Sequence, residues 1–318
     1  MELSDHRPSL FAGARWYEEL AEPARDVPSA WHCTKSEMNW AAQLLSVAAD
    51  YAHERGLLDI YRARLAGISA VELTPERAKA NSRSVSSPIW VILHELIVAC
   101  YLERVLGWKF DKHEPAGYKS SRGDWQLTTQ SGESIFVEVK TAEEAEFYGE
   151  SGVFSRGVRY KQVRNILKGA YRQLPDDPRS TLVVVVGRDT LEIPFGIMLG
   201  DLFQTLFGAY QLRFRPFEED APGSAGPSFH DMLVHGTKHR RLGCVAGMNL
   251  SGLEIPRLGF YAIDNPYAEG GKRIREESFT DARRFFIDRS GHGEDRNGLS
   301  HCDAWERMSH RTIVAGAA

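Results

Sequence analysis

The sequence predicts an α/β fold in which a mixed β-sheet is flanked by helices and preceded by an N-terminal helical region. Three observations lead to this prediction. Apolar side chains recur at helical spacing in the first part of the chain, a long apolar helix follows, and short β-prone runs then flank a basic helix. This order divides the chain into a helical region at residues 1–85, a sheet-bearing domain at residues 86–269 and a polar C-terminal tail at residues 270–318.

The N-terminal region is expected to contain two helices, one over residues 36–55 and one over residues 57–65. The apolar stripe of the first consists of Trp40, Leu44, Leu45, Ala48 and Tyr51. A polar linker at residues 81–88 marks the boundary to the next domain. No residue of this region suggests chemistry, so docking onto the sheet, recognition of a target and binding of a partner are all open roles.

A long, largely apolar helix is predicted after the linker. Ser87 is a suitable helix cap, Pro88 suits the first turn, and residues 89–106 are apolar nearly all round. Glu95 lies on the apolar stripe of this helix, so its carboxylate needs a partner. One alternative is a structural ion pair with an arginine or with groups near His94. The other is that Glu95 faces the next part of the chain as a third acid of a metal cluster.

That next part carries Asp124 and the triplet Glu138-Val139-Lys140 on two β-prone runs around a polar, glycine-containing turn, which is typical of a β-hairpin. Side chains alternate along a strand, so Glu138 and Lys140 share one face and Val139 takes the other. A three-residue turn or a bulge places Asp124 opposite Glu138 or Lys140. An unbulged two-residue turn would place it opposite Val139 instead.

In the first of these registers two carboxylates lie close together and repel each other. A divalent cation is then the natural way to keep both ionised at neutral pH. Oxygen ligands select Mg²⁺ or Mn²⁺ over zinc. Lys140 would bond the attacking water or stabilise the charge that develops on a phosphate. The alternative is a surface hairpin on which Asp124, Glu138 and Lys140 are solvated.

A basic helix is predicted near residues 156–174, a stretch without acidic residues. Its cations recur three and four residues apart and form one stripe, for which phosphate is the natural partner, although a solvated helix face is the alternative. The candidate nucleic-acid contacts in this helix and in the loop before Asp124 are Lys119, Arg122, Arg159, Lys161, Gln162, Arg164 and Lys168.

Further strands are expected later in the chain. The β-branched run at residues 181–186 suits a buried central strand, and residues 241–250 and 258–264 are expected to extend the sheet. The basic run at residues 238–241 is either a phosphate contact or a solvated surface segment.

The order of these features resembles the PD-(D/E)XK nuclease superfamily, whose restriction-endonuclease-like core is a mixed sheet flanked by helices. The features that match are the helix with Glu95, then Asp124, then Glu138-Val139-Lys140, the basic helix and the strand at residues 181–186. The match covers roughly residues 86–190. Gly123 stands where the motif has proline, and Gln162 is followed four residues later by Ile166 rather than by the tyrosine of the RecB-like branch.

The resemblance implies a metal-dependent nuclease that hydrolyses phosphodiester bonds, with Mg²⁺ or Mn²⁺ as cofactor. It implies that Asp124, Glu138 and the Val139 carbonyl bind the metal, that Lys140 assists the attacking water, and that Glu95 is an auxiliary acid. The resemblance alone favours DNA over RNA and suggests a restriction or phage-defence effector. The competing interpretation is a non-catalytic subunit on the same fold, which binds nucleic acid or serves as a scaffold in a larger complex.

The composition is ordinary, with 42% hydrophobic residues, a pI near 6.3 and a formal net charge of −4, so nucleic-acid contacts are expected from a local patch only. No apolar run is long enough for a membrane span and the N-terminus lacks the apolar core of a signal peptide, so a cytoplasmic location is expected. The four cysteines have neither disulfide-framework nor zinc spacing. A homodimer and a partner subunit of a defence system are both open.

Overall fold

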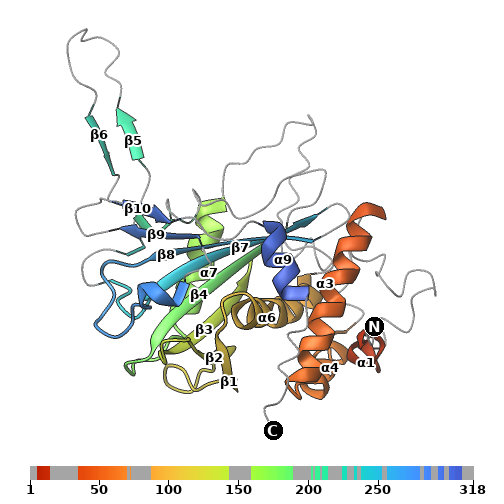
Figure 1. Ribbon diagram of the computed structural model, residues 1–318. Helices are drawn as coiled ribbons and strands as arrows, with labels where there is room; N and C mark the ends of the chain where they lie inside the picture. The colour runs from red at the N-terminus through yellow and green to blue at the C-terminus, as the bar shows by residue number, and fades with distance from the viewer. Residues whose placement is uncertain are drawn as a thin grey trace.

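The computed structural model describes residues 6–14, 35–69, 72, 87–142, 159–188, 202, 205–207, 210–213, 224–227, 233–234, 238–252, 256–279, 283–287, 293–296 and 301–309. Within these residues the fold is α/β, with a mixed sheet flanked by helices as the sequence predicts (Figure 1). None of the helices described there is long and apolar enough to cross a membrane.

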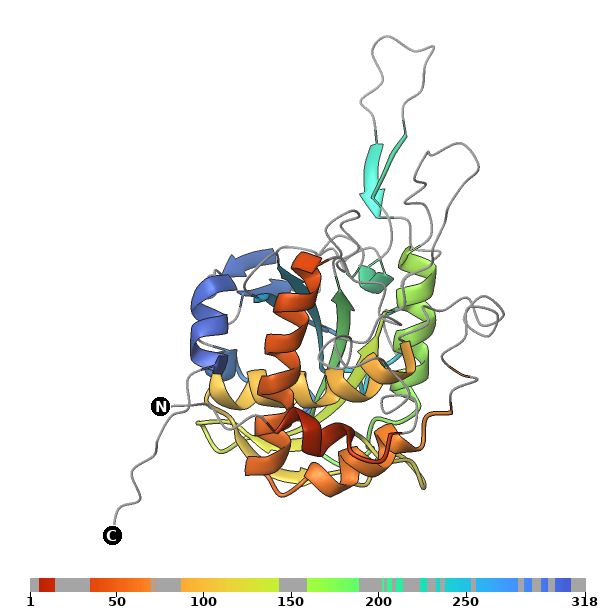
Figure 2. The same cartoon turned by 90° about the vertical axis from the view of Figure 1, so that its right-hand side faces the viewer.

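The main sheet has eight strands in the order β1-β2-β3-β4-β7-β8-β9-β10. Their bounds are β1 Lys109–His113, β2 Trp125–Thr128, β3 Ser134–Thr141, β4 Ser180–Arg188, β7 Cys244–Gly252, β8 Pro256–Asp264, β9 Arg283–Ile287 and β10 Gly293–Arg296. The central pairs β3–β4 and β4–β7 are parallel, as is β8–β9, and the other neighbours are antiparallel. A separate two-stranded sheet, β5 (Tyr210–Arg213) with β6 (Ser224–Pro227), stands away from the main sheet in Figures 1 and 2.

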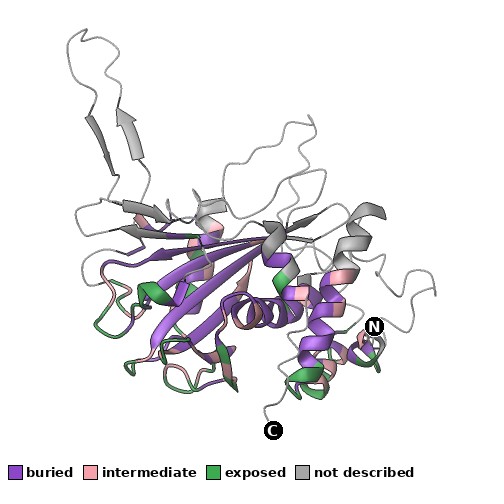
Figure 3. Cartoon of the chain, viewed as in Figure 1, coloured by how far each residue is buried: buried purple, intermediate pink, exposed green. Residues whose placement is uncertain are grey.

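Helices cover both faces of the central strands. The helix α6 (Ser87–Arg104) packs on one face, while α7 (Arg159–Tyr171) packs on the other. Successive side chains of β4 point to opposite faces of the sheet, so Val184 belongs to the core under α6 and Val183 to the core under α7. Both faces are therefore buried, which is why β4 is a nearly continuous apolar run (Figure 3).

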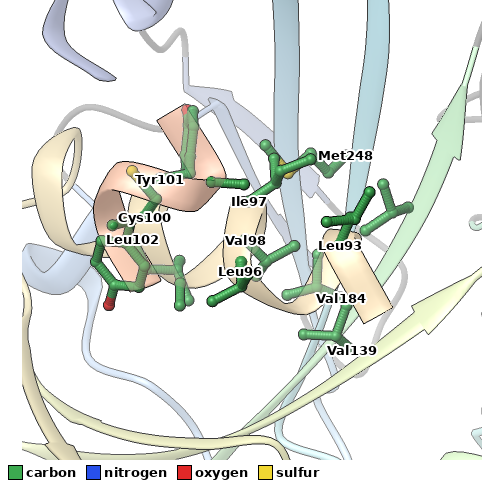
Figure 4. Close-up of a cluster of buried hydrophobic side chains, with 14 of the residues drawn as sticks. Leu93, Leu96, Ile97, Val98, Cys100, Tyr101, Leu102, Val139, Val184 and Met248 are labelled. Atoms are coloured by element: carbon green, nitrogen blue, oxygen red, sulfur yellow. The ribbon is translucent and has the colours of Figure 1, made fainter. Parts of the chain in front are cut away.

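The helix α6 is the centre of the larger core. Its side chains contact Val139, Val184 and Met248 from three neighbouring strands (Figure 4). The predicted start at Ser87 is confirmed, and Leu93, the first of its labelled core residues in Figure 4, is fully buried. At the C-terminal end of α6 the contacts are polar, and Arg104 donates to the Met308 carbonyl at 2.8 Å.

The N-terminal helices belong to the same core. These helices are α1 (Arg7–Phe11), α3 (Lys35–Glu54) and α4 (Leu58–Ala66), of which α3 and α4 match the two predicted helices. Leu10, Leu44 and Leu65 are buried in the cluster that also contains the α6 side chains. The core is thus continuous across the boundary predicted near residue 85.

The segment after residue 270, expected as a polar tail, contributes to the sheet and the core. It forms a short 3-10 helix η5 (Glu276–Phe279), the strands β9 and β10, and the helix α9 (His301–Ser309). Trp305 and Met308 of α9 are buried against the larger core. Arg284 of β9 donates to both oxygens of Asp264 on β8, at 2.8 and 3.0 Å, and both side chains are almost fully buried. The description of this segment as a tail is corrected accordingly.

Candidate active site

The hairpin register brings Asp124 and Glu138 together. In the pairing of β2 with β3, Trp125 lies opposite Val137 and Thr128 opposite Ser134. Continued by one position, that pairing sets Asp124 opposite Glu138. The turn is longer than two residues, and Gly132 adopts φ of +79° in it, which glycine tolerates best. The register that the metal-site prediction required is therefore present.

Asp124 directly precedes β2, and its carboxylate is turned toward β3. Its backbone N–H donates to the Val137 carbonyl at 3.2 Å, and its Oδ2 accepts the Val139 N–H at 2.6 Å. The Asp124 carboxylate thus accepts the Val139 N–H in place of a backbone carbonyl of β2. Burial raises the pKa of Asp124 well above its usual value, and the charges of Glu138 and Glu95 raise it further.

Glu138 is the most buried of the acids. Its side chain is 1% exposed, and its Oε1 accepts an ion-paired hydrogen bond from Nζ of Lys140. Its Oε2 is buried and has no hydrogen-bond partner among the described residues. Burial raises the pKa of Glu138 to about 7, although Lys140 lowers it, and the charge of Glu95 adds to the rise.

Lys140 lies next to Glu138 and is partly exposed to solvent. It shares the face of Glu138 and Phe136, which is the face covered by α7, and its side chain is 28% exposed. β3 ends at Thr141, whose Oγ1 lies 2.9 Å from Nδ1 of His94 on α6. Lys140 can therefore reach a ligand in solvent while its charge remains paired with Glu138.

Glu95 comes from α6 and has a guanidinium partner. Nη1 of Arg64 on α4 donates to Oε2 of Glu95 at 2.5 Å, and Nη2 donates to Oε1 at 2.6 Å. The hydroxyl of Tyr61 donates to the same carboxylate at 3.0 Å. Of the two alternatives for Glu95, the ion pair with an arginine is thus present, and its charge still acts on Asp124 and Glu138.

The α4 residues that reach this site are ones for which the sequence suggests no chemistry. The Tyr61 hydroxyl lies 3.3 Å from Nε2 of His113, and the Tyr61 ring stacks on Trp125, with 6.2 Å between ring centroids. The guanidinium of Arg64 lies 5.0 Å from the Tyr61 ring. The only sequence signal for these contacts is that the buried Glu95 carboxylate needs a cationic partner. The sequence did not distinguish Arg64 from Arg62, which pairs with Asp59 instead.

The donor set suits a hard cation. It comprises the carboxylates of Asp124 and Glu138, one oxygen of which has no hydrogen-bond partner among the described residues. In an extended strand the N–H and C=O of one residue point to the same edge, so the Val139 carbonyl faces the edge at which Asp124 lies. In the described part of the chain, no three His, Cys, Asp or Glu side chains gather to hold a metal ion. Two carboxylates and one backbone oxygen make up this donor set instead.

The predicted nucleic-acid contacts fall into two groups on the α7 face. In the loop before Asp124, Lys119 is exposed, whereas Arg122 pairs with Glu114 at 2.8 Å. On α7, Gln162 and Arg164 are half-buried and Lys168 is exposed. Arg159 and Lys161 belong to α7, but their side chains lie outside the described residues.

The fold and the site thus define an α/β protein with a paired-carboxylate site on a mixed sheet. Comparisons with models of protein families, with curated proteins and with solved structures found no match to this chain.

Proposed function

We propose that this protein is a metal-dependent nuclease with a restriction-endonuclease-like core that hydrolyses phosphodiester bonds. The observation that supports the proposal best is the pair of the half-buried Asp124, next to the start of β2, and the buried Glu138 on β3, whose pKa values are both raised. Placing two such carboxylates side by side costs folding free energy, and a divalent cation offsets that cost by keeping both ionised.

Asp124, Glu138 and the Val139 carbonyl would hold Mg²⁺ or Mn²⁺. A bound ion of this kind polarises a phosphate and lowers the pKa of a coordinated water. The Val139 N–H fixes one oxygen of Asp124 through the 2.6 Å hydrogen bond, so the other oxygen is left for the ligand side. The Asp124 carboxylate is therefore preorganised for a ligand.

Lys140 would act on the phosphate side. Its ammonium is held next to Glu138 and is partly exposed, so it can donate to the attacking water or to a phosphate oxygen as negative charge develops there. Glu95 would act as the auxiliary acid. Its partner Arg64 and the Tyr61 hydroxyl hold the Glu95 carboxylate in a fixed direction.

The experiment is a cleavage assay with linear duplex, circular duplex and single-stranded DNA and with RNA, each with Mg²⁺, with Mn²⁺ and with a chelator. We expect metal-dependent cleavage by the wild-type protein and none by Asp124→Asn or Lys140→Met, with binding of the substrate largely retained. DNA is the expected substrate, and a restriction or phage-defence effector is the expected setting. Equal cleavage by wild type and both purified variants would refute the proposal.

A second candidate function is a non-catalytic nucleic-acid-binding or scaffold subunit. The observation that favours it is that Lys140 and Arg64 already pair with Glu138 and Glu95, so two of the three acids have a cation without any metal. Thermal melting with and without Mn²⁺ or Ca²⁺ separates the two. A working carboxylate site gains stability from the ion by mass action, whereas a site whose charges are satisfied internally does not.

A further inference from the structure

Two basic segments that are far apart in the sequence meet on the α7 face of the protein. One is the exposed side of α7 and the turn after it, with Lys168 and Arg172. The other is the segment before β7, with Lys238 and Arg240. All four of these side chains are exposed. We call them the α7–238 cluster.

The two segments are fixed to each other by stacked groups. The guanidinium of Arg241 lies 4.5 Å from the ring of Tyr171 and 4.2 Å from the ring of Tyr118, and its Nη1 donates to the Leu174 carbonyl at 2.6 Å. The rings of Tyr171 and His239 meet edge to face, with 4.6 Å between centroids. These contacts place residues 238–241 directly against the last turns of α7.

His239 lies among the cations of both segments. Its Nδ1 donates to the Leu233 carbonyl at 2.7 Å, so the ring is held in place. Burial lowers the pKa of His239, and the charges of Lys168, Lys238 and Arg164 lower it further. The ring is therefore neutral at pH 7, and the positive charge around it comes from the lysines and the arginine.

The two lysines of the cluster, Lys168 and Lys238, have little acidic compensation among the described residues. Within the part of the chain that the structure describes, neither Lys168 nor Lys238 has a carboxylate at ion-pair distance, and the nearby Asp176 is paired with Arg241 at 3.2 Å. A solvated helix face usually mixes the two signs of charge, so this surface is suited to a polyanion.

The cluster also lies on the same face as the acid site. α7 packs against the side of β3 that carries Phe136, Glu138 and Lys140. The 238–241 segment lies at the start of β4, because Thr181 Oγ1 donates to the Arg241 carbonyl at 2.6 Å, and Ser180, the first residue of β4, pairs with Ile135. Glu138 is three residues further along β3, so the level of this start of β4 and that of Glu138 differ by roughly 10 Å along the strands. That distance is about three nucleotides of a helical strand at roughly 3.4 Å each.

We propose that the α7–238 cluster binds the phosphate backbone of the nucleic acid whose strand reaches Glu138 and Lys140. This inference rests on the proposed nuclease function for the identity of the polyanion. It makes the surface a sequence-independent backbone contact, since lysine and arginine on phosphate position a duplex without reading its bases.

The test uses the double variant Lys168→Gln/Lys238→Gln in the full-length protein, in an Asp124→Asn background so that the probe is not cut. Binding of fluorescently labelled duplex DNA, single-stranded DNA and RNA is measured by anisotropy over a series of salt concentrations. Two lost phosphate contacts should lower the slope of log affinity against log salt by about 2 and weaken binding on the order of 50-fold near 0.1 M salt. The matched control, Lys109→Gln/Lys112→Gln, makes the same charge change on exposed residues of the edge strand β1 and should bind as the parent does.

Parent-like affinity and salt slope in the cluster variant would overturn the inference. So would failure of the parent protein to bind any of the three nucleic acids. The proposed function fails separately. If the protein with Asp124 intact binds duplex through the cluster but cuts nothing with Mg²⁺ or Mn²⁺, the cluster assignment stands and the nuclease assignment falls.

Discussion

Replacing Glu138 by glutamine tests whether this acid is held at an energetic cost in the metal-free protein. In the wild type the pKa of Glu138 is raised to about 7 from its ordinary value of 4.5. Between these two values the folded protein keeps a proton that the unfolded chain has already released. The stability of the metal-free protein should therefore fall as pH rises through this window and level off above about pH 7.

The magnitude follows from the shift. Each pKa unit corresponds to about 1.4 kcal/mol, so the Glu138 contribution to stability should fall by about 2 to 3 kcal/mol between about pH 5 and pH 8. Glutamine cannot ionise, and Glu138→Gln also removes the charge that raises the pKa of Asp124. The variant should lose most of this pH dependence. The free energy of unfolding of the variant minus that of the wild type should therefore be larger at pH 8 than at pH 5.

The assay is urea unfolding of both proteins in a chelator, at several pH values across this range. Glu277→Gln is the matched control, because Glu277 is exposed and its replacement removes one carboxylate from the same chain. Titrating groups away from the site contribute equally to both proteins, so the difference between the two curves reports Glu138 together with its effect on Asp124. Parallel curves for wild type and Glu138→Gln would refute the argument that Glu138 is a strained, proton-binding acid.

Two further substitutions test the surroundings of the site. Arg64→Gln leaves Glu95 buried without its ion pair and should lower the free energy of unfolding, measured in urea, by about 3 to 5 kcal/mol. The double variant Arg64→Gln/Glu95→Gln should recover part of this loss. A loss below about 1 kcal/mol would show that the pair contributes little. Gly123→Ala would place a Cβ well inside contact distance of the Phe136 ring, so the loop before Asp124 must shift, and we expect a lower melting temperature corresponding to about 1 to 3 kcal/mol. An unchanged melting temperature would mean that this loop does not pack closely over Phe136.

Elements with strong periodicity could be predicted from the sequence. The helices at 35–54, 58–66 and 87–104 lie close to the expected ranges, and the run at 181–186 lies within β4 in the middle of the sheet. The apolar patterns at 35–54 and 87–104 are long, and the run at 181–186 is rich in β-branched residues, so one interpretation satisfies each of these three. The hairpin could be predicted too, but not its register, because the length of a turn is set by backbone geometry that residue types constrain only weakly.

The C-terminal segment could not be predicted with the same ease because its apolar residues are few. In α9 only Ala304, Trp305 and Met308 are buried among the side chains that the structure describes, and a run of charges surrounds them. Their spacing of one and four residues is a helical stripe, so a signal was present, but it is short. The placement of this stripe against α6 depends on contacts between residues roughly two hundred positions apart, such as Arg104 with Met308.

The candidate site divides in the same way. Asp124, Glu138 and Lys140 could be selected from residue type and spacing, because alternation along one strand relates two of them directly. Arg64 and Tyr61 could not, since only the docking of α4 on α6 and the sheet brings them near Glu95. The meeting of Lys168 with Lys238 likewise depends on the stacking of Arg241 between two tyrosines, which no local pattern encodes.

The most direct test of the central claim is a count of Mn²⁺ ions bound per chain, measured by electron paramagnetic resonance near pH 8. The wild-type protein should bind one or two ions, as a paired-carboxylate site for phosphoryl chemistry does. Asp124→Asn/Glu138→Gln should bind none at the same concentrations. Equal binding by the two proteins would place the ion elsewhere, and no binding by the wild type would leave the proposed chemistry without its cofactor.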